Sequence, residues 1–476
     1  MNKLTLSLLV FASSIAISAY SQNVTLDNTF GQNGRTIIPN TSEIHFLDFD
    51  VQGNIITVGY PTNSGGGNDL TIAKTNSNGI IDNGFGNNGV VKITDYDYIS
   101  PLGLKITNDN KIVVIGSFSN VQIGVSENIM MRFNENGTVD QNFGDNGKVN
   151  LNVGYTMSLN MESDDFILMA KMDNHQVAHI LKYNYAGEID ESFGENGIVS
   201  LTNSIRPRCM KILNNGFIVI AGTYGSFPNT ELGLGKLTPA GELDTNFANN
   251  GIWHLDVEQD FDFDHESFYN IFEDDNGNLI LSGSGRSICG TSWSGAFLSK
   301  FSFNGILDTD FGDNGFYCSN TGISLISQIE NKYLIAGYHN SGYKITIINK
   351  DGKSGNEAYI CGIIYLRNMK LQGNNKIILG GGHQASNADA ALERVVFDFE
   401  TSIKPNKYSS NGLVIFPNPV KGNLYFSNET TFEIIDIQGK ILLQSATPVK
   451  SVNIDNLVAG IYFVRLGNSV QKFVKE

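Results

Sequence analysis

The residues of this chain that could do chemistry are concentrated in one motif, Asp-x-x-Phe-Gly-x-Asn-Gly, which recurs six times with small variations. Its carboxylate and amide oxygens are hard ligands of the kind that calcium prefers. The residue before Asn-Gly, however, varies among Gln, Asn, Asp and Glu from copy to copy. We therefore interpret the motif as structural, with Phe packed between sheets and Asn and Gly in left-handed turns. We expect no bound metal ion and no cofactor.

A second recurring feature is a basic residue that precedes the motif Asp by eight positions. A short hairpin between the two should bring the opposite charges onto one face of a sheet. Because the pair recurs in five units, we expect it to support the fold, whereas a substrate site would occur in one place. The five pairs are Lys74 with Asp82, Arg132 with Asp140, Lys182 with Asp190, Lys236 with Asp244 and Lys300 with Asp308.

The densest acidic run is Asp260-Phe-Asp-Phe-Asp-His-Glu266. Two carboxylates in such a run could cleave a glycosidic bond, but alternating Asp and Phe is more simply the pattern of a strand with one solvated face. Nucleophile elbows, His-Glu-x-x-His zinc sites, phosphate loops and dinucleotide fingerprints are absent from the sequence. We therefore expect no catalytic residues.

A candidate ligand site follows from seven apolar strands, which end in the small residues Gly59, Gly116, Ala170, Gly222, Gly283, Gly337 and Gly381. Two positions later stand Pro61, Phe118, Met172, Tyr224, Gly285, His339 and His383, which should share one rim. Because the repeat is least regular around the last two units, we predict a ligand near His339 and His383, with Tyr338 and Gln384 as neighbours. The alternative is that these side chains fill space beneath the loops.

The elements that position these residues are all strands. Runs such as Ile112–Gly116 are apolar at every position, which indicates strands covered on both faces. Alternating strands with Asn-Gly hairpins follow them. Four strands per unit, repeated seven times, predict an all-β, seven-bladed β-propeller. A β-solenoid is the second choice, since its repeats are usually shorter and need caps.

Closure of the ring can be predicted from the two ends of the repeat region. The seventh unit ends near Phe399 without a motif, and residues 24–30 supply that motif at the N-terminal end. We predict that this segment completes the last blade and removes an exposed sheet edge. The motifs resemble the delta-60 repeat family of bacterial exported proteins over residues 22–402. That resemblance implies an architecture and no particular reaction.

The C-terminal region differs from the repeats. Residues 403–412 are a polar linker, and the short strands of residues 413–476 predict a small antiparallel β-sandwich. The region contains a set of motif residues, Pro417, Asn418, Pro419, Asp436, Gly439, Lys440, Gly460 and Tyr462, together with the closing Lys472–Glu476. In these residues it resembles the type A sorting domain of the type IX secretion system of Bacteroidota.

This second resemblance implies partners. They are the type IX secretion machinery, a sortase-like peptidase that removes the domain, and lipopolysaccharide as the anchor if the body is not released. Residues 1–21, with Lys3 before the apolar stretch Leu4–Ile17, have the pattern of a signal peptide. We therefore expect export through the periplasm to the outer-membrane surface or the medium.

Charge and cysteine content narrow the remaining choices. The formal net charge is −16 and no run of Lys and Arg occurs, which disfavours nucleic acid as a partner. Four cysteines allow at most two disulfides, whose pairing the sequence does not reveal. We predict a secreted or surface-displayed binding or scaffold protein for an unknown ligand, a glycan or a protein. The alternative is an extracellular propeller enzyme, a lyase or hydrolase acting on polysaccharide.

Overall fold

The structure of the chain is a computed structural model. It describes residues 24–62, 69–94, 96–120, 124–151, 155–162, 165–171, 177–201, 205–226, 229–255, 267–289, 295–319, 322–339, 342–353, 355–360, 363–383, 389–397, 415–436, 439–466 and 469–476. These residues divide into two compact units, one up to residue 398 and one from residue 399 onward.

The first unit consists of antiparallel sheets that we call blades 1 to 7. Blades 1 to 3 contain, in hydrogen-bonded order, β3 (Thr41–Phe49), β4 (Ile55–Pro61), β5 (Leu70–Thr75) and β6 (Val90–Ile93); β7 (Tyr98–Ile106), β8 (Ile112–Asn120), β9 (Val125–Phe133) and β10 (Lys148–Asn150); and β11 (Tyr155–Glu162), β12 (Asp165–Lys171), β13 (Ala178–Tyr183) and β14 (Ile198–Leu201).

Blades 4 to 6 follow the same order with β15 (Ile205–Ile212), β16 (Ile218–Ser226), β17 (Asn229–Leu237) and β18 (Ile252–Leu255); β19 (Ser267–Glu273), β20 (Leu279–Gly285), β21 (Gly295–Phe301) and β22 (Phe316–Ser319); and β23 (Leu325–Ile329), β24 (Lys332–His339), β25 (Gly342–Asn349) and β26 (Gly355–Ile360). Blade 7 contains β27 (Ile363–Gln372), β28 (Lys376–His383), β29 (Ala390–Phe397), β1 (Val24–Leu26) and β2 (Arg35–Ile38).

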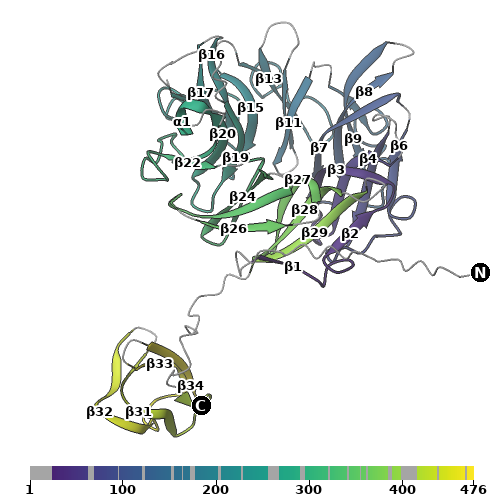
Figure 1. Cartoon of the computed structure of the whole chain (residues 1–476). Helices are drawn as coiled ribbons and strands as arrows, with labels where there is room; N and C mark the ends of the chain where they lie inside the picture. The colour runs from purple at the N-terminus through teal and green to yellow at the C-terminus, as the bar shows by residue number, and fades with distance from the viewer. Residues whose placement is uncertain are drawn as a thin grey trace, which may run out of the picture. The chain divides into compact units, whose positions relative to one another are not determined.

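The first strand of each blade is the innermost strand of a ring. Strands β3, β7, β11, β15, β19, β23 and β27 contact one another in that order, and β27 contacts β3 in turn. The sheets therefore surround a common centre (Figure 1), and the predicted all-β propeller class is confirmed. One helical turn, α1 (Arg286–Cys289), interrupts the strands of blade 5 within the described part of the chain.

The ring closes as predicted, through the N-terminal strands. Val24 pairs with Phe397 in β1, and Arg35 pairs with Glu393 in β2, so both strands lie beside β29 (Figure 1). The Arg35 Nε–H donates to the Glu393 carboxylate at 2.8 Å. Burial raises the pKa of Glu393 and Arg35 opposes this shift. The ends of the repeat region are thus joined by backbone pairing and by an ion pair.

The repeated motif joins each blade to the next. Its phenylalanines are at most 1% exposed and lie against a hairpin glycine of the following blade, as Phe143 does against Gly187. The residue after Phe donates its backbone N–H to the same hairpin, as Gly144 does to Ala186 at 3.0 Å. The motif Asn and Gly have positive φ, which these residues adopt at least cost. The structural interpretation of the motif is therefore confirmed.

The second unit is one antiparallel sheet of β30 (Ile415–Phe416), β31 (Asn423–Ile435), β32 (Ile441–Asn453), β33 (Gly460–Leu466) and β34 (Ser469–Lys475). The long strand β31 pairs with β30, β32 and β33, so the described strands form a single connected antiparallel sheet. The hydrophobic core of this unit includes Leu424, Ile434 and Phe473.

Candidate functional site

The predicted pairs of a cation with a motif Asp are confirmed in four of the five units. The distances from cation nitrogen to carboxylate oxygen are 2.8 Å for Arg132–Asp140, 2.9 Å for Lys182–Asp190, 3.2 Å for Lys236–Asp244 and 2.8 Å for Lys300–Asp308. The Lys74–Asp82 prediction is wrong. Lys74 instead contacts the buried carboxylate of Asp50 at 3.2 Å and Glu135 at 3.3 Å, because the turn after β3 places Asp50 closer.

An equivalent ion pair forms in blade 7, across the ring closure. Arg394 on β29 contacts Asp27 at 2.8 Å, although the two residues lie at opposite ends of the propeller sequence. Burial alone would raise the pKa of Asp27, but hydrogen bonds from Thr29 and Lys376 outweigh burial and lower it. The N-terminal segment therefore restores the same ionic contact that the other blades contain.

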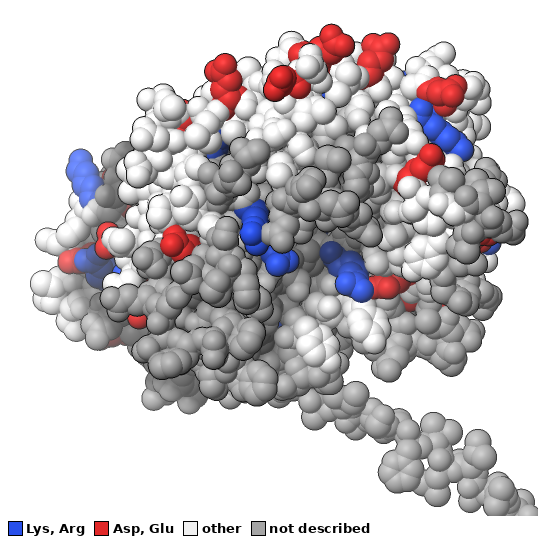
Figure 2. All heavy atoms as spheres, turned by 90° about the horizontal axis from the view of Figure 1, so that it is seen from above, with Lys and Arg blue, Asp and Glu red and all other residues white. Residues whose placement is uncertain are grey.

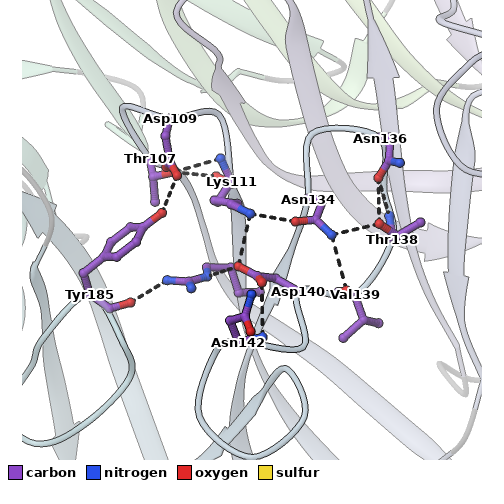
Figure 3. A network of polar contacts seen from close by, with 11 residues as sticks. Thr107, Asp109, Lys111, Asn134, Asn136, Thr138, Val139, Asp140, Asn142 and Tyr185 are labelled. Atoms are coloured by element: carbon purple, nitrogen blue, oxygen red, sulfur yellow. Dashed lines mark hydrogen bonds and ion pairs between the residues drawn. The ribbon is translucent and has the colours of Figure 1, made fainter.

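The Arg132–Asp140 ion pair belongs to a network of polar contacts at the junction of blades 2 and 3 (Figure 3). The Arg132 guanidinium lies 4.4 Å and 4.3 Å from the ring centroids of Phe143 and Tyr185. The Tyr185 hydroxyl donates to Asp109 at 2.6 Å, and burial together with this contact raises the pKa of Tyr185 to about 12. Lys111 completes the network at 3.3 Å from Asp140. Because these groups contact one another across the junction, the network supports the packing of blade 2 against blade 3.

A different set of side chains is directed by β-bulges in the innermost strands. In six of the blades described, one extra residue stands opposite the repeated small residue, which shifts the register of the first two strands. The extra residues, which we call the bulge residues, are His45, Leu102, Met157, Arg208, Tyr269 and Arg367. A bulge re-aims the side chain that it carries.

The repeated glycine permits this bulge. A Cβ atom on Gly59, Gly222 or Gly381 would collide with a carbonyl oxygen of the innermost strand, at Glu43, Arg206 and Tyr365 respectively. In these three blades the repeated glycine is therefore a steric requirement of the bulge next to it.

The predicted ligand rim is described in part. Tyr338 is 52% exposed at the end of β24, and its ring lies edge-on to that of Tyr343 at 5.7 Å between centroids. The backbones of His339 and His383 end β24 and β28, where they pair with Gly342 and Ile363. The side chains of both histidines, and the whole of Gln384, lie outside the described residues.

The corresponding positions of other blades follow the packing alternative. Phe118 is 1% exposed and Pro61 is buried, so neither is available to a ligand. Tyr224 stacks on His254, with the rings 4.3 Å apart and 10° from parallel, and His254 Nδ1 lies 2.6 Å from Glu231. The rim is therefore not uniform, and its accessible aromatic side chains include Tyr338 in blade 6.

A group at blades 6, 7 and 1, which we call the Tyr–Arg cluster, contains Tyr338, Tyr343, Tyr365, Arg367 and Glu43. Tyr365 is 59% exposed, and the half-exposed Arg367 places its Nε 2.6 Å from Glu43. Burial raises the pKa of Tyr343. The positive charge of Arg367 lowers it, and Glu43 raises it, with smaller contributions in the same direction from Tyr338 and Tyr365. The five side chains therefore share one electrostatic environment.

Glu43 is the carboxylate of this cluster. The interaction with His45, 3.4 Å away, is the largest cause that lowers the pKa of Glu43 to about 2, and Arg367 adds to it against the effect of burial. Glu43 is therefore ionised over the physiological pH range and orients Arg367. The outer surface of the cluster presents two phenol rings and part of a guanidinium group.

The sequence predicted Tyr338 but not Glu43 or Tyr365, and it predicted none of the bulge residues, Arg367 among them. A bulge depends on the pairing of two strands and not on a local residue pattern, so these residues had no signal of their own. The one indirect signal was the repeated small residue opposite each bulge.

The predicted sorting-motif residues have structural roles within the second unit. The Asn418 side-chain amide donates to the Lys472 carbonyl at 3.0 Å and accepts from Val474 N–H at 2.9 Å, which fixes β34 beside Pro417 and Pro419. Asp436 accepts from the Lys440 N–H at 2.9 Å across a turn in which Gly439 has φ of 85°. Gly460 begins β33, and the buried Tyr462 donates to the Val458 carbonyl at 2.8 Å.

The cysteines and the acidic run were the other residues that the sequence singled out. Cys289 and Cys318 form a disulfide between α1 and β22, and burial raises the pKa of the free Cys209 thiol. The acidic run of residues 260–266 lies outside the described residues. Where the structure is described, no three His, Cys, Asp or Glu side chains are grouped to hold a metal ion. No helix in those same segments has the length and apolar character to cross a membrane.

Family comparisons match both units. Residues 414–476 match the family described as "Secretion system C-terminal sorting domain". Residues 53–85 and 107–143 match "Domain of unknown function (DUF5122) beta-propeller". No curated protein sequence matches the chain.

Solved propellers are similar at low identity. The β-propeller domain of the Trilobed protease from Pyrococcus furiosus is 10% identical, with a TM-score of 0.38 over 80% of this chain and 96% of that one. The WD40 domain of Toxoplasma gondii coronin is 10% identical, with a TM-score of 0.44 over 80% and 85%. YCF48 bound to D1 peptide is 10% identical, with a TM-score of 0.44 over 79% and 99%. By its own strand topology and the two family matches, the chain is a β-propeller protein that carries a secretion-system C-terminal sorting domain.

Proposed function

We propose that the chain is exported by the type IX secretion system and acts outside the cell as a ligand-binding propeller. The observation that carries the export part is the family match over residues 414–476, which covers the described second unit from end to end. In this proposal residues 1–21 are a signal peptide, residues 22–402 are the functional body and residues 403–412 are the linker to the sorting domain. A sortase-like peptidase removes that domain, and the body is released or joined to lipopolysaccharide.

The ligand part of the proposal rests on the exposure of the Tyr–Arg cluster. Tyrosine and arginine are the residue types most often used where a surface must bind, because a phenol ring combines a large apolar face with a hydroxyl group at low entropic cost. Tyr338 and Tyr365 are more than half exposed. The proposed ligand is an extracellular glycan or protein that contacts this cluster, with His339, His383 and Gln384 at its margin.

Export can be tested with a single substitution in the sorting domain. Asn418→Ala removes two hydrogen bonds between the Pro417–Pro419 segment and β34, so we expect the protein to accumulate in the periplasm and to disappear from the medium and the surface. Asn423→Ala, at an exposed position of the same unit, is the matched control. Normal surface delivery of a chain that lacks residues 414–476 would contradict the export proposal.

Ligand binding can be tested with the intact exported chain. We expect a screen of glycans and extracellular proteins to yield a ligand whose affinity falls when Tyr338 and Tyr365 are both changed to Ala. Tyr98→Ala, at a comparably exposed tyrosine on blade 2, should leave that affinity unchanged. A ligand that binds all three proteins equally would place the site elsewhere.

A further inference from the structure

Arg206 and Arg208 differ from four other arginines of the propeller whose side chains are described. Arg35, Arg132, Arg367 and Arg394 each contact a carboxylate. Arg206 and Arg208, on the innermost strand of blade 4, have no acidic partner among the described residues, although the chain carries a net charge of −16. Arg208 is exposed and Arg206 is partly exposed. Within the described residues, two arginines that stand two positions apart in the sequence thus lack a carboxylate partner and expose side-chain surface to an external anion.

The backbone holds these two side chains in a defined place. Arg208 is the bulge residue of β15, and the buried Pro207 between the two arginines pairs with Gly222. A Cβ atom on Gly222 would collide with the Arg206 carbonyl oxygen, so the strand approaches as closely as a glycine allows. The arginines thus project from a rigid strand and not from a surface loop, which reduces the entropy lost on binding.

An aromatic ring from the next blade completes the group. The Arg208 guanidinium carbon lies 5.8 Å from the centroid of Tyr269, the bulge residue of blade 5. Tyr269 is 39% exposed, and its hydroxyl lies 3.0 Å from Ser284 Oγ. Tyr269 is thus positioned by Ser284 and Arg208, and its exposed part remains accessible to a ligand.

The repeat register relates this group to the Tyr–Arg cluster. Arg208 and Arg367 are both bulge residues, and Arg206 and Tyr365 both pair with the residue that follows the repeated glycine. Equivalent positions in equivalent blades lie at the same end of the ring and at similar distances from its centre. Figure 2 shows basic side chains near the middle of one face and acidic side chains mainly toward its outer edge.

We propose that Arg206, Arg208 and Tyr269 form an anion subsite that takes the carboxylate groups of an acidic glycan, a polysaccharide that contains uronic acid. Guanidinium groups bind carboxylates through two parallel hydrogen bonds, which an ammonium group does not match. The phenol ring of Tyr269 offers an apolar face to the sugar ring beside the carboxylate. This inference rests on the proposed function and specifies the ligand of that surface.

A glycan fits the surface better than an acidic peptide does. A peptide that binds by strand addition needs a straight and regular sheet edge. Bulges interrupt the ladder of the innermost strand in six described blades, blade 4 included, which makes these edges poor templates for pairing. Recognition at the middle of the ring therefore depends on side chains.

Calorimetric titration of the intact exported chain tests this inference. The probes are hexagalacturonate, the same hexamer with every carboxylate methyl-esterified, and a hexaglutamate peptide. We expect hexagalacturonate to bind, the ester to bind at least about tenfold more weakly, and binding to weaken as salt is added, because the contacts are charge-assisted hydrogen bonds. Arg206→Gln with Arg208→Gln should reduce the affinity for hexagalacturonate by about tenfold or more.

Two further variants separate charge from geometry. Arg206→Lys with Arg208→Lys retains the charge and loses the fork of donors, so we expect an intermediate affinity. Lys92→Gln removes an exposed cation from the outer strand of blade 1 and should have no effect. Because the two arginines have no ion pair within the described part of the chain, their replacement should leave the melting temperature nearly unchanged, which shows that the variants are folded.

The inference is overturned if hexagalacturonate does not bind, if the ester binds as well, or if the double Gln variant retains full affinity. Equal, arginine-dependent binding of hexaglutamate would assign the surface to acidic peptides and would also overturn it. A neutral glycan or a protein that binds in a Tyr338- and Tyr365-dependent way, unaffected by the double Gln variant, would reject the anion subsite and leave the proposed function intact.

Discussion

The junction of blades 2 and 3 and the junction of blades 6 and 7 differ in one structural part. At the first, Phe143 lies against the hairpin of blade 3 and Gly144 donates to Ala186. At the second, β25 is followed by no Phe-Gly motif, and the corresponding hairpin of blade 7 does not exist, because β29 and β1 are separate ends of the repeat region. A motif on blade 6 would have no hairpin to contact.

The irregular repeat beside blades 6 and 7 follows from the ring closure. The loss of the motif between blades 6 and 7 has a structural cause in the ring closure, so irregular repetition is not by itself an argument for function there. The ligand site is therefore supported by the solvent exposure of its tyrosine side chains. Arg132 and Asp140 at the junction of blades 2 and 3 are buried within a polar network, whereas Tyr338 and Tyr365 beside the other junction are more than half exposed.

The largest expected effect comes from breaking the closure. Deleting residues 23–30 removes β1, the fully buried Phe30 and the Asp27–Arg394 pair. Loss of a buried phenylalanine alone costs about 3–5 kcal/mol, which is a large fraction of the stability of a typical domain. We expect the melting temperature of the propeller to fall sharply.

Tryptophan fluorescence measures this effect selectively, because both tryptophans of the chain, Trp253 and Trp293, precede residue 398. Leu26→Ala, at a position that is 37% exposed in the same segment, should change the melting temperature little. An unaltered transition after the deletion would show that the N-terminal strands do not hold the ring closed.

The next largest effect is expected for Arg132, which is 4% exposed. Arg132→Met leaves the Asp140 carboxylate without its main partner, and removal of one member of a buried ion pair costs about 3–5 kcal/mol. Arg206→Met is the matched control, since that side chain has no acidic partner in the described structure and should change the unfolding free energy by less than about 0.5 kcal/mol. Urea unfolding measures both. Equal losses in the two variants would remove the distinction between paired and unpaired arginines.

A smaller effect is expected on the pH dependence of the unfolding free energy, through the ionisation of Glu43. Its pKa is lowered from 4.5 to about 2 in the folded chain, so its ionisation stabilises the fold above pH 4.5 and this stabilisation is lost as the pH falls toward 2. Glu43→Gln should remove on the order of 2 kcal/mol from the difference in unfolding free energy between those two pH values. Glu195→Gln, at an exposed carboxylate, should leave the profile as it is. Parallel profiles for the Glu43 variant and the unmodified protein would contradict this prediction.

How much the sequence revealed depended on whether the interaction was local. The motif and the four-stranded unit were predictable because each is a local pattern, and the closing role of residues 24–30 was predictable because the last unit lacks the motif that those residues supply. The bulge at Arg208 was not, because it is a property of two paired strands. The Lys74 partner was predicted wrongly because the competing Asp50 comes from a turn outside the hairpin. The Cys289–Cys318 bridge was unreadable, since four cysteines allow several pairings.

The smallest effect on stability should accompany the largest effect on binding. Changing Tyr338 and Tyr365 to Ala removes two side chains that are 52% and 59% exposed, so the unfolding free energy should change by less than about 0.5 kcal/mol for each residue. If these rings contact the ligand, affinity should fall by about tenfold or more, because aromatic side chains dominate such surfaces. Phe118→Ala, at the corresponding rim of blade 2, should do the reverse, since its buried ring contributes about 3–5 kcal/mol to stability. The two variants thus separate exposed aromatic side chains that bind a ligand from a buried rim side chain that packs. A large loss of stability in the tyrosine variant, with affinity retained, would assign Tyr338 and Tyr365 to packing as well.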